Sequence, residues 1–353
     1  MTLRVLHIVP DSVNRPDLFY LGTTKDIECR REYFRARGMV VQERAVIRRD
    51  DKMRDQLAAS PWVSPIDIIF WDVPGFYPRS VAFLLEREPR ARLLVRSFNA
   101  EVPHRLDYAR VTPGWRAKGE FLRQAAAFFF YDRWLGRVAQ AVLPISDWDA
   151  GYWRRMSARA RVAPVPYFLP DLYERRLPRG SKENLCVCVG SVRPGVFIDD
   201  ATWQFISMVD GLKGKIPDWR FAVTSSRFSL RVKGRVEFWG FDESPFRFLS
   251  AARALALLSP LGRGFKTKIL DAIAAGAAAL VPPDLFRRMP EELKPFCRVV
   301  RRGVPADLAR ALETLPVGTR GSPNEDLRRR AFTALDRVFE TVPQSERIPV
   351  MVG

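Results

Sequence analysis

The sequence predicts an α/β protein of two domains, each built on a doubly wound parallel sheet. Short apolar strands alternate with helical segments along most of the 353 residues. The alternation stops in a Pro-rich stretch, residues 162–180, and then starts again. Strands such as 66–74 are nearly continuous apolar runs, which is typical of parallel strands covered by helices on both faces. We therefore expect an N-terminal domain over 1–168, a second domain over 169–330, and a C-terminal helix and tail over 331–353.

The first domain begins with a strand at 4–10. A turn containing Gly22 follows it, and then a helix that ends at Gly38, because glycine readily adopts the left-handed conformation of a C-cap. Further strands are expected at 39–46, 66–74, 91–99 and 139–146. A helix at 147–156 follows the last of them.

The second domain repeats this order. Its expected strands are 184–191, 219–226, 235–241, 254–261 and 277–283. Its expected helices are 199–216, 243–252 and 266–276. Ligands of such sheets bind at the carboxyl ends of the strands, so the two domains are expected to face each other across a cleft.

Composition narrows the class of protein. The formal charge is +18, yet no recognition module for nucleic acid is visible, so a nucleic-acid partner is not expected. The four cysteines are scattered, which fits a reducing cytoplasm. We see neither a secretory signal nor an apolar run of about 18 residues, and we expect a cytoplasmic protein, with the inner face of the cell membrane as an open alternative.

The stretch "GRGFKTKILDAIAAGAAALV", residues 262–281, places two lysines at the start of an expected helix. Lysine is scarce in this chain, which has 58 Lys and Arg in all and only ten Lys, so Lys266 and Lys268 stand out. Backbone N–H groups at a helix start are unpaired and favour anions. An ammonium group follows phosphate oxygens as a point charge, whereas arginine imposes a planar fork. The motif predicts a diphosphate site, with an ordinary turn bearing two solvated lysines as the alternative.

This stretch resembles the "G-x-G-x-K-T-K" segment of GT-B fold nucleotide-sugar glycosyltransferases, near glycosyltransferase family 4. Other segments are similar in the same order: "VCVGSVRPG", "RVEFWGFDES", "LLVRSFNAEVPHR" and "AQAVLPISDWDAGYW". The resemblance implies two Rossmann-like domains, an acceptor-side domain first and a nucleotide-sugar donor domain second. It also implies transfer of a sugar from a UDP- or GDP-linked donor, with no separate cofactor.

Carried over by position, the resemblance implies a set of donor contacts. These residues are Gly22, Thr23, Gly190, Ser191, Arg193, Gly240, Phe241, Lys266, Thr267 and Asp271. Lys268 would stabilise the leaving diphosphate and so take part in catalysis. Two positions depart from the family pattern, because Asp271 stands where a Glu usually reaches the ribose and Arg263 replaces the first Glu of an acidic pair. These departures leave the donor sugar undetermined.

The acceptor side needs a base for an inverting reaction. Glu101 follows an expected strand end and is the candidate, although a capping or loop role is equally open. The resemblance places Arg96, Asn99 and His104 on the same side. Asp72 and His7 are more simply interpreted as structural, and no Asp-x-Asp metal motif ends a strand, so we expect transfer without a metal.

Residues 113–138 combine aromatic and basic side chains, among them Trp115, Phe128, Phe129 and Phe130. Such a helix suits the surface of an anionic membrane, and a core helix with a solvated basic face is an even alternative. A lipid-diphosphate-linked acceptor would account for both the helix and the charge. The sequence therefore predicts a glycosyltransferase of polysaccharide or glycoconjugate synthesis acting on a glycan or lipid-linked acceptor. The alternative is a non-catalytic GT-B protein that binds a nucleotide sugar or a partner.

Overall fold

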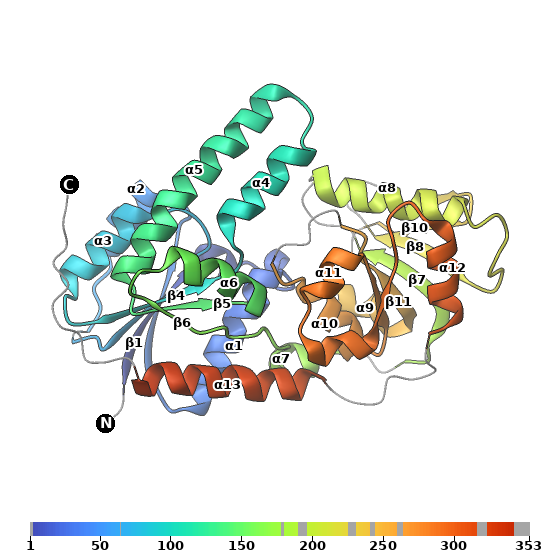
Figure 1. The fold of residues 1–353 in the computed structure, drawn as a ribbon. Coiled ribbons are helices and arrows are strands. Elements are labelled where there is room, and N and C mark those ends of the chain that lie inside the picture. The colour runs from blue at the N-terminus through green and yellow to red at the C-terminus, as the bar shows by residue number, and fades with distance from the viewer. Residues whose placement is uncertain are drawn as a thin grey trace. The chain divides into compact units, whose positions relative to one another are not determined.

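The computed structural model describes residues 3–63, 65–177, 180–189, 196–224, 231–240, 244–259, 264–315 and 323–341. The chain divides into two compact units. Unit 1 comprises Met1–Phe168, Arg263–Phe265 and Arg328–Gly353, and unit 2 comprises Leu169–Gly262 and Lys266–Leu327. Each unit has its own sheet with helices packed against it (Figure 1), which confirms the predicted α/β class with two doubly wound sheets.

The sheet of unit 1 has six strands in the order β2-β1-β3-β4-β5-β6, and every described pairing in it is parallel. The strands are β1 (Arg4–Pro10), β2 (Val40–Val46), β3 (Ile68–Trp71), β4 (Arg92–Ser97), β5 (Ala141–Pro144) and β6 (Arg161–Val162). The chain leaves β1 toward β2 on one side and then returns to β3 on the other. The carboxyl ends of β1 and β3 are therefore the point at which strand order reverses, where sheets of this kind place their ligands.

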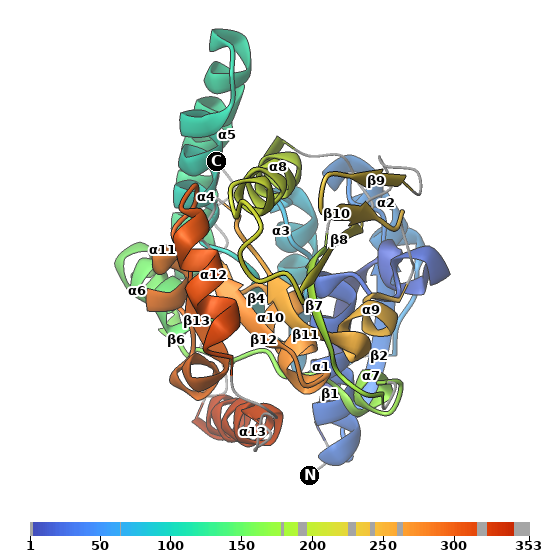
Figure 2. The ribbon, with the colours of Figure 1, turned by 90° about the vertical axis from the view of Figure 1, so that its right-hand side faces the viewer.

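Helices and short 3₁₀ turns connect these strands. They are η1 (Asp11–Asn14), η2 (Pro16–Leu18), α1 (Gly22–Ala36), α2 (Asp50–Ala59), α3 (Pro78–Arg87), α4 (Glu101–Val111), α5 (Trp115–Val138) and α6 (Asp147–Met156). Figures 1 and 2 show that α4 and α5 form an antiparallel pair whose joined end projects away from the sheet of unit 1. The inner half of α5 packs on the sheet through Phe128, Tyr131 and Leu135.

The sheet of unit 2 has seven strands in the order β13-β12-β11-β7-β8-β10-β9, with β9 antiparallel to β10 at one edge. The strands are β7 (Glu183–Val189), β8 (Arg220–Thr224), β9 (Arg231–Lys233), β10 (Val236–Phe238), β11 (Ala252–Ala256), β12 (Ala278–Val281) and β13 (Cys297–Val299). Here β7 is followed by β8 on one side and later by β11 on the other. The reversal point of unit 2 therefore lies at the carboxyl ends of β7 and β11.

The remaining helices belong mainly to unit 2. They are α7 (Asp171–Glu174), α8 (Val196–Asp210), α9 (Pro245–Ala251), α10 (Thr267–Ala274), α11 (Pro283–Arg287), η3 (Glu291–Phe296), α12 (Pro305–Glu313) and α13 (Pro323–Thr341). The Lys182 ammonium donates hydrogen bonds to the carbonyls of Leu249, Ala252 and Ala275, at the ends of α9 and α10. A cation at helix C-termini is favourable because the last carbonyls there lack helical partners.

The helix α13 returns to unit 1 although it follows unit 2 in the sequence. The first segment of unit 1 ends at Phe168. Within α13, unit 2 ends at Leu327 and unit 1 resumes at Arg328, a few residues before the boundary expected at 330. Phe339 of α13 packs against Tyr33 and Phe34 of α1, with ring centroids 5.6 and 6.3 Å away. None of the helices that the structure describes is long and apolar enough to cross a membrane.

Buried charges connect the central elements of unit 1. His7 on β1 is completely buried and lies 3.2 Å from both Asp72 and Glu43. Arg30 of α1 donates to both oxygens of Asp72 at 2.8 and 3.0 Å, and it also pairs with Asp26 at 2.7 Å. His7 and Asp72 are thus structural, in agreement with the simpler interpretation of the sequence.

The charges around His7 determine how it titrates. Burial alone lowers the pKa of His7, but the hydrogen bonds and charges of Asp72 and Glu43 outweigh it and raise the pKa above 6.5. The folded protein therefore binds a proton at pH values where the unfolded chain has lost it. The resulting stabilisation is complete below about pH 6.5, and it is lost as the pH rises through the folded-state pKa.

We predict that His7→Gln abolishes this part of the pH dependence of stability. As the pH rises above about 6.5, wild-type protein should lose free energy of unfolding more steeply than the variant does. Urea unfolding at several pH values measures the two slopes. His104→Gln, which replaces the other histidine, is the control and should keep the wild-type slope. Equal slopes for wild type and His7→Gln would show that His7 does not carry this proton.

Candidate functional site

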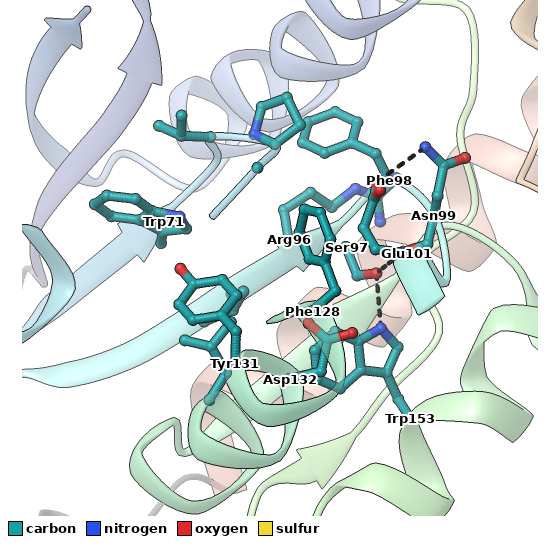
Figure 3. A pocket seen from close by; sticks show the side chains of 15 residues that line it. Trp71, Arg96, Ser97, Phe98, Asn99, Glu101, Phe128, Tyr131, Asp132 and Trp153 are labelled. Atoms are coloured by element: carbon teal, nitrogen blue, oxygen red, sulfur yellow. Dashed lines mark hydrogen bonds between the residues drawn. The ribbon is translucent and has the colours of Figure 1, made fainter. Parts of the chain in front are cut away.

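A small pocket lies at the carboxyl ends of β3 and β4 in unit 1, next to the reversal point of the sheet. Its cavity volume is ≈ 30 Å³, enough for about two water molecules. Figure 3 shows the side chains around it, which come from both strand ends and from α4, α5 and α6. The lining residues are Trp71, Val73, Pro74, Gly75, Val95, Arg96, Ser97, Phe98, Asn99, Glu101, Phe128, Tyr131, Asp132, Leu135 and Trp153.

Glu101 stands at the entrance of this pocket as the first residue of α4. One carboxylate oxygen lies 3.1 Å from Arg105, one turn along the helix, and the other lies 3.5 Å from the amide nitrogen of Asn99. Its side chain is 16% exposed, so a ligand could reach it. Burial raises the pKa of Glu101, and Arg105 and Asn99 oppose the rise. A carboxylate with a raised pKa at a strand end is suited to accept a proton near neutral pH.

Asp132 on α5 is the second carboxyl group of the pocket. The residue is 3% exposed, and it accepts a hydrogen bond from the Tyr152 hydroxyl at 2.5 Å. Burial raises the pKa of Asp132 to about 8; the bond from Tyr152 acts against the rise, and the charge of Glu101 adds to it. At neutral pH Asp132 is therefore mostly protonated, beside a second carboxyl group, Glu101, whose pKa is also raised.

Aromatic rings form most of the remaining wall. Trp153 donates its indole N–H to the Ser97 hydroxyl at 2.7 Å, and that hydroxyl donates to the carbonyl of Asn99 at 2.9 Å. These bonds fix the backbone that carries Asn99 toward Glu101. A pocket of aromatic rings with a few polar groups is the usual composition of a site for a small organic ligand.

The structure brings together some of the predicted acceptor-side residues. Asn99 and Glu101 meet at the pocket entrance, as described above. Arg96 also lines the pocket, but its guanidinium is held by both oxygens of Asp26, at 2.9 and 2.7 Å, and by the carbonyls of Leu143 and Val165. Arg96 is only 2% exposed, and these bonds join β4 to α1, to β5 and to Val165. Its acceptor-side role stays a prediction. His104 does not line the pocket, and its ring packs edge-on against Tyr108 at 4.9 Å.

In unit 2, the two lysines of the sequence motif lie at the start of α10. Lys266 is the N-cap residue, and Thr267 and Lys268 are the first two residues of the helix. The Lys268 ammonium donates to the carbonyl of Val189 at 3.2 Å. Val189 is the last residue of β7, so Lys268 is held at the reversal point of the second sheet.

Lysine is an unusual residue at the N-cap of a helix. An N-cap side chain normally accepts a hydrogen bond from the first helical N–H groups, but lysine has no acceptor, and no side-chain cap is formed here. Two positive charges at the positive end of the helix dipole also destabilise the helix. A bound anion would accept hydrogen bonds from the N–H groups of the first turn, and both ammonium groups would attract it.

The other predicted donor residues are placed as follows. Gly22 and Thr23 are the first residues of α1 and are half-buried. Gly240 follows β10 with a φ of 72°, a conformation that favours glycine. Asp271 is completely buried in α10, so its contact with a ribose stays a prediction. Four predicted residues and the departure at Arg263 lie outside the described residues; the four are Gly190, Ser191, Arg193 and Phe241.

Sequence reasoning missed Asp132, Trp71 and Trp153. A signal for Asp132 was present, because it falls in the apolar stripe formed by Phe128, Tyr131 and Leu135 on one face of α5. A carboxyl group in such a stripe is either paired or functional. The tryptophans gave no comparable signal, since aromatic residues at strand ends are common in any core.

Comparison with known proteins gives structural matches only. No family model matches the sequence, and neither does any curated protein. HepE of Anabaena, solved with UDP and glucose, is 12% identical with a TM-score of 0.57 over 96% of this chain and 99% of that one. Sucrose-phosphate synthase of Thermosynechococcus elongatus is 15% identical with a TM-score of 0.60 over 96% of each chain. A glycosyltransferase involved in avilamycin A biosynthesis is 13% identical with a TM-score of 0.53, over 96% of this chain and 97% of that one.

These matches extend over nearly the whole chain and therefore include both sheets. The chain has the GT-B glycosyltransferase fold. The fold expected from the sequence is thus confirmed. Membership of glycosyltransferase family 4 stays a prediction.

Proposed function

We propose that this protein is a glycosyltransferase that transfers a sugar from a nucleotide-sugar donor to a glycan or a lipid-linked acceptor. The observation that carries the proposal is the start of α10, where Lys266 and Lys268 lie at the reversal point of a parallel sheet without a side-chain cap. Such a helix start is suited to the diphosphate of a nucleotide sugar. HepE, a protein with the same fold, was solved with UDP and glucose, which makes UDP the first nucleotide to test.

The chemistry would divide between the two units. The ammonium groups and helix N–H groups would stabilise the negative charge on the leaving diphosphate. Glu101 would accept the proton of the acceptor hydroxyl, for which its raised pKa is suited. These groups supply stabilisation and proton transfer without a metal, so we propose metal-independent transfer. We also propose that the protein works on the cytoplasmic side of a membrane, where nucleotide sugars are available.

We predict that Lys268→Ala weakens UDP binding by about ten- to a hundredfold, because a charge-assisted hydrogen bond contributes about 1.5–3 kcal/mol. Uridine should bind the variant and the wild type equally, since it has no phosphate to lose a partner. Lys268→Arg should recover only part of the loss, because the guanidinium fork must fit a space shaped for an ammonium group.

Calorimetry with UDP, GDP and uridine measures these affinities. Lys52→Ala, at an exposed position on α2, removes the same charge far from α10 along the chain and serves as the control. If Lys266→Ala and Lys268→Ala both bind the diphosphates as tightly as Lys52→Ala does, the lysines are solvated turn residues.

We predict that Glu101→Gln lowers turnover by at least about a hundredfold, the lower end of what general-base catalysis contributes. UDP affinity should stay within a few-fold, since Glu101 belongs to unit 1 and the lysines to unit 2. Arg105→Gln, which removes the ion-pair partner of Glu101 and the cation over the Phe128 ring, should have a smaller effect on turnover. Turnover of a UDP-sugar at the wild-type rate by Glu101→Gln would exclude this role. UDP binding without any turnover by wild type would favour the non-catalytic alternative.

The projecting part of α5 supports a contact with an anionic membrane. Trp115, Leu122 and Phe129 recur every seven residues and so lie along one line of the helix, and they are 77%, 51% and 38% exposed. Phe130, 71% exposed, lies beside the end of this line. Exposed basic residues accompany them, namely Arg116, Lys118, Arg123, Arg133 and Arg137. Aromatic and aliphatic side chains with basic neighbours are the composition of helices that lie in a membrane interface.

The structure corrects one part of the expected surface. Phe128 is 6% exposed and packs in the core of unit 1, so it is not available to lipid. The surface that we propose for lipid consists of Trp115, Leu122, Phe129 and Phe130 with their basic neighbours. A lipid-diphosphate-linked acceptor would be reached from this surface.

We predict that Trp115→Ser with Phe130→Ser reduces binding to vesicles of phosphatidylglycerol and phosphatidylcholine by at least tenfold, since about 25 cal/mol is lost for each Å² of apolar surface no longer buried. Co-sedimentation measures the bound fraction. Val63→Ser is the control, because it removes an exposed apolar side chain from the segment between α2 and β3. Far-UV circular dichroism verifies that each variant is folded. Equal binding by the double variant and the Val63→Ser control would show that this surface does not meet lipid.

A further inference from the structure

The packing around Asp132 does not require a carboxyl group at this position. It lies on the buried face of α5, between Phe128 and Leu135, and within the described part of the chain no lysine or arginine pairs with it. Burying a carboxyl group in an apolar setting is costly, whereas a leucine at this position would add to the core. Among the residues that the structure describes, its one hydrogen-bond donor is Tyr152 on α6.

The residues that line the pocket are half-buried at its entrance and buried at its floor. Pro74, Gly75, Phe98, Asn99 and Glu101 at the entrance are half-buried. The floor consists of fully buried groups, namely Trp71, Tyr131, Asp132, Leu135 and Trp153. Figure 3 shows Glu101 approaching with Asn99 from one side and Asp132 approaching from α5.

The size and lining of the pocket restrict what can enter. A volume of ≈ 30 Å³ is too small for a sugar ring, but it is large enough for one hydroxyl or hydroxymethyl group with the ring left at the entrance. Aromatic walls favour the carbon atoms of such a group, and the carboxyl groups supply donors and acceptors for its oxygen. Glu101 and Asp132 line the same pocket, and the charge of Glu101 acts on Asp132.

We propose that this pocket is a specificity subsite that takes one hydroxyl or hydroxymethyl group of the acceptor sugar, with Asp132 as its ligand at the floor. The inference rests on the proposed glycosyltransferase function and adds to it which side chain selects the acceptor. Asp132 is a binding residue here, and Glu101 remains the candidate base. An acceptor without a polar group at this position would leave the second oxygen of Asp132 buried without a hydrogen-bond partner, and would be rejected.

The competing explanation is that Asp132 only anchors Tyr152. Two variants separate the explanations. Tyr152→Phe removes the anchor but keeps the carboxyl group, and Tyr152 itself does not line the pocket. Asp132→Leu combined with Tyr152→Phe replaces both partners of the hydrogen bond by apolar groups of similar shape, a change that is often nearly neutral for stability.

The experiment measures binding of free sugars by saturation-transfer NMR in the presence of saturating UDP. The probes are glucose, galactose, mannose, N-acetylglucosamine and glycerol, and UDP affinity is measured in parallel by calorimetry. We expect at least one sugar to bind the wild type and Tyr152→Phe alike. The double variant should bind it at least about tenfold more weakly, as the loss of one hydrogen bond to a buried group implies. UDP affinity should be equal in all three proteins.

Each other result overturns the inference. If the double variant binds the sugar as well as Tyr152→Phe does, Asp132 is an anchor and not a ligand. If UDP binds but none of the sugars does, the pocket holds only water, and the proposed transferase function can still stand. If UDP itself does not bind the wild type, the proposed function fails, and the subsite that rests on it fails with it.

Discussion

The buried ion network of unit 1 is the constraint on which its candidate site depends. Arg30 and Arg96 share Asp26, and Arg30 also binds Asp72, so that α1, β4 and the end of β3 are joined by charges with almost no contact to water. Removing one partner of such a set leaves the other buried charges unpaired and lowers the free energy of unfolding by about 3–5 kcal/mol. The same side chains fix the strand ends from which the pocket opens. The positions of Glu101 and Asn99 therefore depend on a buried network of which only Arg96 lines the pocket.

The two units provide different electrostatic environments at the carboxyl ends of their strands. At the reversal point of unit 2, backbone N–H groups and ammonium groups create a positive site at the start of α10. At the carboxyl edge of unit 1, two carboxyl groups are partly deprived of water, and the pKa of each is raised. A reaction that separates an anionic leaving group from a hydroxyl proton needs both kinds of environment. The fold provides them on separate sheets, each at the edge where strand order reverses.

The fold was predictable from the sequence because its strongest signals are local. Apolar runs such as 66–74 and the restart after the Pro-rich stretch indicated two parallel sheets without any knowledge of contacts. The helix that begins at Thr267 and its two lysines were also visible, since a helix start depends on neighbouring residues. Asp132 and the engagement of Arg96 were not, because both depend on which elements pack together. The sequence suggested Arg96 as an acceptor-side residue but could not show its partners, Asp26 and two carbonyls that are distant in the sequence.

The return of α13 to unit 1 has a consequence for how the protein is made. Leu335, Val338 and Phe339 are buried, and Phe339 covers Tyr33 and Phe34 near the start of the chain. A ribosome delivers these residues only after all of unit 2 has been synthesised. During translation, unit 2 can complete its core as soon as its residues emerge, while unit 1 keeps an apolar face of α1 uncovered until the end. The unit that is synthesised first is thus the last to be finished.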